Sequence, residues 1–127
     1  MPNWQPNWQD VRWNYEASGR AASELRRAAD AIDQATHDRS VAADEARREW
    51  RGPYRRRFDG YFQDATARAS ALAEEYRAEA RRIDWASQRA REEQQRRVRE
   101  RERWFREKED EDRRQREQDA RNRNQRR

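Results

Sequence analysis

The stretch Glu49-Trp50-Arg51-Gly52-Pro53-Tyr54 lies between two long segments of helical periodicity, and it decides how the chain folds. Gly52 can adopt the left-handed backbone conformation that closes a helix, in which a residue with a Cβ atom is strained. Pro53 cannot continue the helix before it, but it suits the first position of the next one. The sequence therefore predicts two helices joined by a turn at residues 51–53.

The segment before this turn carries apolar residues at alternating steps of three and four, from Trp8 to Trp50. This spacing places one apolar face along a helix. Asn7 is a suitable N-cap for that helix, and two prolines precede it, so residues 1–7 are predicted to be an irregular lead-in. One motif occurs twice at the start of the chain, as Pro2-Asn3-Trp4-Gln5 and Pro6-Asn7-Trp8-Gln9.

The segment after the turn carries a matching apolar face from Phe58 to Ala90. Folding back at Gly52 brings the two faces together as an antiparallel hairpin over residues 8–95 and places Trp8 near Arg96. Residues at the centre of the hairpin are expected to be buried more deeply than Trp50 at its end. These central residues are Leu25, Ile32 and Leu72.

The apolar face of the first helix is wider than the contact with one neighbouring helix requires. A second column of alanines flanks it, at Ala21, Ala28, Ala35 and Ala42. A stripe of this width is typical of a bundle helix. The predicted fold class is therefore all-α: an antiparallel helical hairpin with an extended, charged second helix, which pairs with another hairpin into a four-helix bundle.

Residues 96–127 are predicted to form a charged helical extension of the second helix. Acid-to-arginine pairs at i, i+4 begin just before it, with Glu92 and Arg96, and recur along it. Each such pair stabilises a helix by about 0.2–0.5 kcal/mol. The helix is expected to continue to about residue 115 and to fray after Ala120. Trp104 and Phe105 are unusual on so charged a helix, and they indicate a docking spot.

Composition and motifs argue against catalysis. The chain is 45% charged and 32% hydrophobic, which is too polar for an ordinary globular core. It has no cysteine, and its single histidine, His37, lies beside carboxylates on a helix, where a solvated side chain is the usual outcome. We expect no enzyme activity, no metal site and no cofactor. No apolar run is long enough for a signal peptide or a membrane span.

The hairpin tip carries a basic cluster of Arg51, Arg55, Arg56 and Arg57. Two interpretations stay open: solvated guanidinium groups that stack on Tyr54 and Phe58, or a contact with an acidic partner. Binding of nucleic acid through these and the later arginines is the weakest alternative, because acidic residues are interleaved with them nearly everywhere.

The residues Trp50-Arg51-Gly52, between two amphipathic helices in a chain of about this size, resemble the WxG-motif family. These are early-secreted-antigen-like helical hairpins, exported by type VII secretion systems of Gram-positive and actinobacterial cells. The resemblance covers roughly residues 8–95. It implies a dimeric four-helix bundle in which Trp50, Arg51 and Gly52 form a recognition turn. The partner would be a second copy or a paralogous hairpin, and a secretion ATPase would be a further partner.

The family's secretion signal, Tyr-x-x-x-Asp/Glu after the second helix, does not occur in this chain. Phe105 and Glu109 have its spacing, with phenylalanine in place of tyrosine. The resemblance implies a secreted or cell-surface protein that leaves the cell without a signal peptide, with a partner supplying the signal. The alternative is a cytoplasmic coiled-coil adaptor that uses the charged helix for docking.

Overall fold

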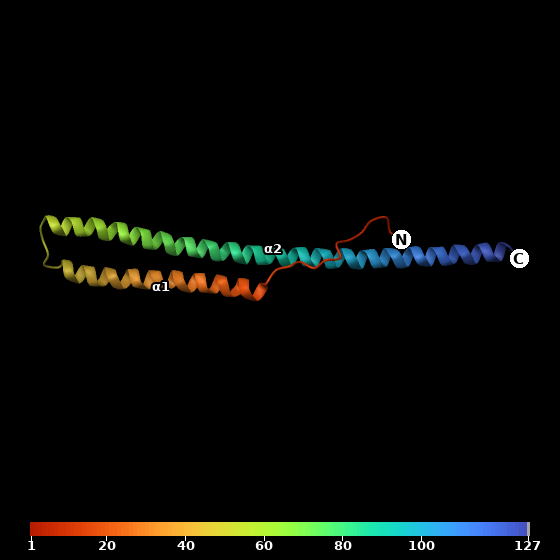
Figure 1. Cartoon of the computed structure of the whole chain (residues 1–127), viewed down its shortest axis with the longest axis horizontal. Coiled ribbons are helices and arrows are strands. Elements are labelled where there is room, and N and C mark those ends of the chain that lie inside the picture. The colour runs from red at the N-terminus through yellow and green to blue at the C-terminus, as the bar shows by residue number, and fades with distance from the viewer. Residues whose placement is uncertain (127) are drawn as a thin grey trace. The chain divides into compact units, whose positions relative to one another are not determined.

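The computed structural model describes residues 1–126; Arg127, the last residue of the predicted extension, lies outside the described residues. The chain forms two helices, α1 (Tyr15–Arg47) and α2 (Pro53–Gln125). Figure 1 shows α1 lying alongside the first part of α2. This confirms the predicted all-α hairpin with a long second helix. The chain divides into two compact units: residues 14–87, which hold the hairpin, and residues 1–13 together with the chain from Gln88 onward.

Helix α1 begins at Tyr15 and not at Trp8, so the prediction that Asn7 is its N-cap is wrong. Asn14 is the N-cap, and its Oδ1 accepts a hydrogen bond of 2.9 Å from the Ala17 amide. Both asparagines satisfy the local rule for a cap. The tertiary structure decides between them, because the segment before Asn14 binds along α2 with non-helical backbone.

The connection between the helices spans residues 48–52, since α1 ends at Arg47. Trp50 therefore lies in this connection and not within the first helix. Gly52 has a φ of 111°, and Pro53 is the first residue of α2. These observations confirm the positive φ and the helix-starting role predicted for the two residues.

The backbone at Gly52 leads to a prediction for stability. We expect Gly52→Ala to lower the free energy of unfolding by about 1–2 kcal/mol, because an L-residue is strained at positive φ. Gly60 is the control: it lies within α2 with open space around it, and Gly60→Ala should raise stability by about 0.5–1 kcal/mol. Urea unfolding followed by circular dichroism measures both. Equal effects from the two changes would contradict a special conformation at Gly52.

The core of the hairpin is a seam of alanines, which let two helices approach closely. The buried residues of this unit's apolar faces are Ala22, Ala29, Ala43, Ala73 and Ala80. Among the described residues no large side chain is fully buried. Leu72, predicted to lie deep in the centre, is 41% exposed and is covered no better than Trp50 at 36%. The prediction of a buried Leu72 is wrong for a single hairpin.

Ion pairs link the two helices across the alanine seam. Arg26 of α1 pairs with Asp84 of α2, and Arg77 of α2 reaches both Asp30 at 3.0 Å and Asp33. The hydrogen bonds that Arg77 donates to Asp33 and then Asp30 raise the pKa of its guanidinium. Because these pairs are mostly solvated, they contribute little to stability, and their main effect is to fix the register.

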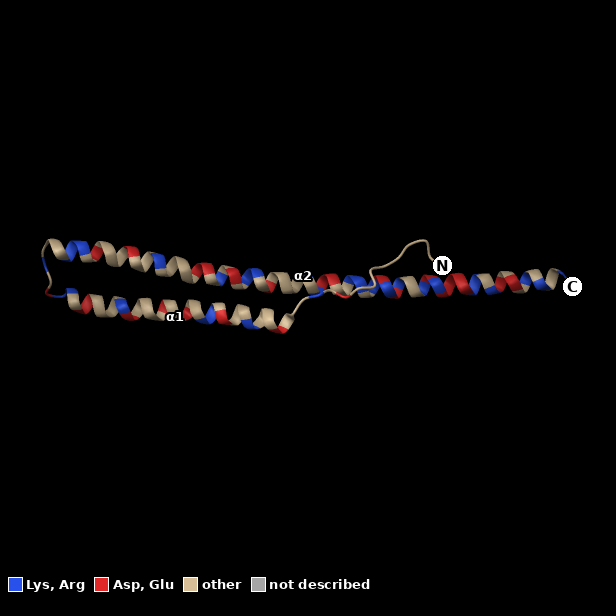
Figure 2. Cartoon of the chain, viewed as in Figure 1, with Lys and Arg blue, Asp and Glu red and all other residues tan. Residues whose placement is uncertain are grey.

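Helix α2 ends at Gln125, later than the sequence predicts. No glycine or proline follows Gly60, and acidic and basic residues alternate along this part of α2 (Figure 2). Side-chain hydrogen bonds four residues apart continue past Ala120, for example from Gln118 to Asn122 at 3.3 Å. Local pairing of polar side chains therefore supports the helix beyond the point where its composition predicts fraying.

Candidate interaction surfaces

The predicted recognition turn lies at the hairpin tip. Arg51 and Gly52 are exposed, while the ring of Trp50 lies 5.3 Å from that of Phe58. The Trp50 carbonyl accepts a hydrogen bond of 2.7 Å from Arg55. The turn thus presents its backbone and one half-covered indole to the outside.

The tip arginines have different environments. Arg55 donates to the Arg47 carbonyl at 3.0 Å as well as to Trp50, so it caps the C-terminal end of α1. Arg57 lies over the Tyr54 ring at 5.8 Å, which is the stacking expected for a solvated cluster. Arg56 is exposed. The tip therefore offers fewer arginines to a partner than the sequence indicates, because Arg55 has a structural role.

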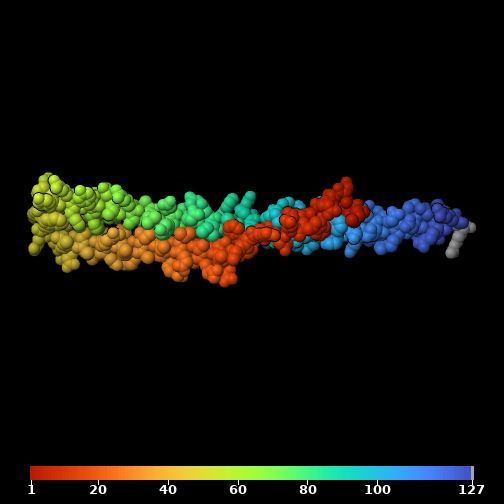
Figure 3. All heavy atoms as spheres, viewed as in Figure 1, coloured from red at the N-terminus to blue at the C-terminus, as the bar shows by residue number. Residues whose placement is uncertain are grey.

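A second surface involves residues 1–13, which we call the N-terminal arm. Figures 1 and 3 show the arm running along α2. Arg101 of α2 donates to the Asn7 carbonyl at 2.9 Å and to the Gln9 carbonyl at 2.7 Å, and it pairs with Asp10 at 2.8 Å. Arg97 donates to the same Gln9 carbonyl at 3.1 Å. Two arginines thereby satisfy backbone acceptors that a helix would otherwise use.

The polar contacts of the arm extend to its end near α1. The Gln94 side chain accepts from the Val11 amide at 2.8 Å and donates to Asp10 at 2.9 Å. Both prolines of the repeated motif, Pro2 and Pro6, are buried. The arm is therefore bound through its backbone and its prolines together, as extended segments are in other recognition sites.

The first tryptophan of the repeat, Trp4, is held by three side chains of α2. Its indole N–H donates to Glu107 at 2.6 Å, and its carbonyl accepts a hydrogen bond of 3.0 Å from the indole N–H of Trp104. The guanidinium of Arg103 lies 4.3 Å from the centre of the Trp4 ring, within the range of a cation–π contact.

The second tryptophan of the repeat, Trp8, lies against the aromatic pair of α2. Its ring centre is 5.2 Å from that of Trp104 and 5.6 Å from that of Phe105, both edge-on. Such aromatic pairs contribute about 0.5–1.5 kcal/mol beyond the burial of area. Trp8 thus lies at Trp104, farther along α2 than Arg96, because extended chain covers more distance per residue than a helix does.

These contacts determine which residues of the predicted docking spot on α2 are accessible. The arm covers Trp104, which is only 6% exposed, so Trp104 is not available to an outside partner while the arm is bound. Phe105 stays about half exposed, and Glu109 is exposed. The structure brings Trp104 and Phe105 together with the arm, whereas the tip arginines belong to the other unit.

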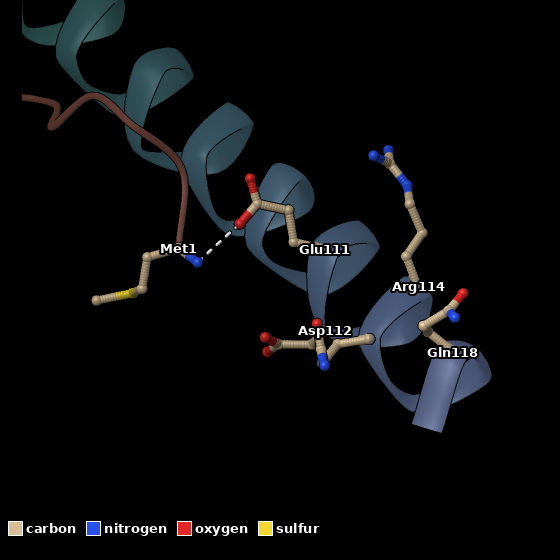
Figure 4. Close-up of a pocket in the computed structure, with 6 residues that line it drawn as sticks. Met1, Glu111, Asp112, Arg114 and Gln118 are labelled. Carbon is tan, nitrogen blue, oxygen red and sulfur yellow. Dashed lines mark ion pairs between the residues drawn. The ribbon is translucent and has the colours of Figure 1, made fainter. Parts of the chain in front are cut away.

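At the start of the arm, the Met1 ammonium pairs with Glu111 of α2 at 2.7 Å (Figure 4). The hollow around this pair is lined mainly by polar side chains of α2, including Asp112, Arg114 and Gln118. Its open, charged lining indicates an extension of the arm contact rather than a pocket for a small apolar ligand.

Acid should loosen the arm. The hydrogen bonds that Gln94 and then Arg101 donate to Asp10 lower the pKa of this arm carboxyl. A carboxyl with a lowered pKa stabilises the bound form above its ordinary pKa and loses that effect as the pH falls through the lowered value. We expect the arm to be docked at neutral pH and to loosen below about pH 4.

The indole N–H signals of Trp4 and Trp104, followed by NMR during acid titration, measure this loosening. Asp10→Asn should reduce the acid-induced change, because the carboxyl that titrates is removed. An arm whose indole signals do not change down to pH 2 would contradict the role of the Asp10 carboxylate.

Sequence reasoning missed the α2 side chains that bind the arm. These side chains lie on one face of α2, but they are polar, so apolar periodicity does not reveal them. They are Gln94, Arg97, Arg101, Glu107 and Glu111. The usable signal was the pair of Pro-Asn-Trp-Gln motifs in a segment without helical character, together with two isolated aromatics on a charged helix.

Within residues 1–126, no cluster of three or more potential metal ligands occurs, and no helix has the length and apolar character needed to cross a membrane. No family model matches this chain, and neither a curated protein nor a solved structure matches it. Any function must therefore be argued from the two surfaces themselves.

Proposed function

We propose that this protein is a non-enzymatic interaction protein whose hairpin pairs with a second helical hairpin, from another copy or a related chain, into a four-helix bundle. The single observation that carries the proposal is the all-alanine core of the hairpin: none of the large apolar side chains among the described residues is fully buried. At about 25 cal/mol per Å², leaving such side chains in water forfeits stabilisation that a pairing surface recovers.

The exposed apolar residues lie on both helices of the hairpin. Leu72 of α2, which flanks the alanine seam, is 41% exposed. Two alanines of the flanking column, Ala35 and Ala42, are also exposed. A second hairpin laid on these residues would bury the wide stripe that a single partner helix leaves partly uncovered.

Sedimentation equilibrium at micromolar concentration tests the pairing. We expect a dimer, and we expect Leu72→Glu to weaken its association, because a carboxylate would be buried in the hairpin interface without a partner. Ala67→Glu is the control: Ala67 lies on the opposite face of the same helix and is exposed, so this variant should remain a dimer. A fully helical wild-type monomer would overturn the proposal.

We further propose that the hairpin acts as a type VII secretion substrate or as its dimeric partner. Support comes from the sequence Trp50-Arg51-Gly52 at the tip of a helical hairpin, with Trp50 only half covered. Because the chain lacks its own Tyr-x-x-x-Asp/Glu signal, a paralogous hairpin would supply it, and a secretion ATPase would bind the pair.

Fractionation of the native host tests this proposal. The protein should be found outside the cytoplasm, and Trp50→Ala should abolish export while leaving a folded dimer. Gln63→Ala, an exposed change in α2, serves as the control. Retention of the wild-type protein in the cytoplasm, with no dependence on Trp50, would instead favour the coiled-coil adaptor.

A further inference from the structure

The face of α2 from Gln94 to Glu111, which we call the arm-docking face, has the properties of a recognition site for an extended peptide. It binds backbone carbonyls of the arm at Trp4, Asn7 and Gln9. Carbonyl recognition of this kind depends on extended backbone and not on how the segment is joined to the rest of the chain. The face can therefore bind the same segment whichever chain supplies it.

The arm follows the arm-docking face at the spacing of extended backbone. From Gln94 to Glu111 the helix advances about 26 Å, at 1.5 Å per residue. The arm covers this distance between Asp10, at Gln94, and Met1, at Glu111. This is roughly 2.8 Å per residue, close to the 3.1 Å of polyproline II. Two prolines favour this conformation before binding, which lowers the entropy lost on docking.

Specificity comes from the tryptophans and from charge. Each tryptophan of the Pro-Asn-Trp-Gln repeat has its own position, Trp4 between Arg103 and Glu107 and Trp8 against Trp104. Near the end of the arm, acidic Asp10 meets basic Arg101. The arm-docking face thus matches a sequence that this chain itself carries.

We infer that the arm-docking face is a recognition site for extended Pro-Asn-Trp-Gln segments, and that the N-terminal arm of a second copy of this chain occupies it by exchange. Each copy carries one arm and one face, so exchange is reciprocal. The hairpin keeps its N-cap during exchange, because Asn14 bonds to Ala17 within α1. Swapping an identical segment between protomers replaces every contact by an equivalent one and costs little.

Binding of a peptide in trans tests the recognition site. The probe is a fluorescent peptide of residues 1–13, and the receptor is the full chain with Trp4→Ala and Trp8→Ala, whose own arm competes poorly. Anisotropy should show saturable binding, and the wild-type chain should bind at least about tenfold more weakly because its arm occupies the face. Adding Arg101→Ala to the receptor should also weaken binding about tenfold or more. A peptide that binds neither receptor would overturn the recognition site.

Cross-linking tests exchange itself. One full chain carries a photoreactive phenylalanine derivative at position 8 together with Arg101→Ala and Trp104→Ala, which disable its own face. The other carries Trp4→Ala and Trp8→Ala and has an intact face. Irradiation of the mixture should join position 8 of the first chain to α2 of the second, near Trp104.

Products that form only within the first chain, or that lie outside the arm-docking face, would overturn exchange. Sedimentation of each chain on its own reports hairpin pairing separately, since each lacks either a working arm or a working face and neither set of substitutions touches the alanine seam. Loss of the cross-link with the dimer retained therefore counts against arm exchange alone.

Discussion

Ala29→Leu should lower the free energy of unfolding of the hairpin by about 3 kcal/mol. Ala29 is completely buried in the seam, as are Ala73 and Ala80 of the facing helix. A leucine has no space between two helices that meet through alanines, so the helices must separate or the side chain must leave its preferred rotamers. Urea unfolding monitored by circular dichroism at 222 nm measures the loss.

The matched control for this change is Ala31→Leu, in the same helix. Ala31 is exposed, and exposed substitutions away from special features usually change stability by less than about 0.5 kcal/mol. A loss at Ala29 no larger than that at Ala31 would mean that the two helices do not meet through the seam.

Two features of the hairpin could be predicted from the sequence because they depend on local chemistry. A glycine that can adopt positive φ, followed by a proline that starts a helix, has one consistent interpretation wherever it occurs. Gly52 and Pro53 accordingly take the predicted roles. The apolar period also predicted the hairpin. The apolar period did not show that alanines would form the seam between α1 and α2, or that Leu72 would lie at the edge of that helix–helix contact.

The start of α1 could not be predicted in the same way. Trp8 and Val11 happen to continue the three–four spacing of the helix, and Asn7 and Asn14 are equally good caps. The outcome depends on partners far away in the sequence: Arg101 takes the carbonyl of Asn7, and Gln94 takes the amide of Val11. Contacts over such separations override local propensity, and no single segment contains their signal.

The docking role predicted for the aromatic pair of α2 stays a prediction, and the structure adds that the arm of the same chain covers one of the two residues. An isolated tryptophan on a charged helix does indicate a contact, but composition cannot say whether its partner is another protein or another part of the chain. Trp104 is covered by the arm of its own chain. Phe105 and Glu109 stay accessible on the same helix.

Trp104→Ala should release the N-terminal arm and leave the hairpin folded. Trp104 is the buried aromatic on which Trp8 packs, and its indole N–H holds the Trp4 carbonyl. Truncation of a buried tryptophan at the centre of a contact typically costs about 2 kcal/mol or more, which lowers the ratio of docked to undocked arm by roughly 30-fold. The hairpin belongs to the other compact unit, so its melting temperature should change little.

NMR of the six indole N–H groups measures the docked population, because the signals of Trp4 and Trp8 should move to their random-coil positions in Trp104→Ala. Trp104→Phe separates the two contributions. It keeps an aromatic ring under Trp8 and loses only the hydrogen bond to Trp4, so it should weaken docking by about 1 kcal/mol. If Trp104→Ala instead lowers the melting temperature of the hairpin as much as Ala29→Leu does, the arm is part of the hairpin's stability and does not exchange independently of it.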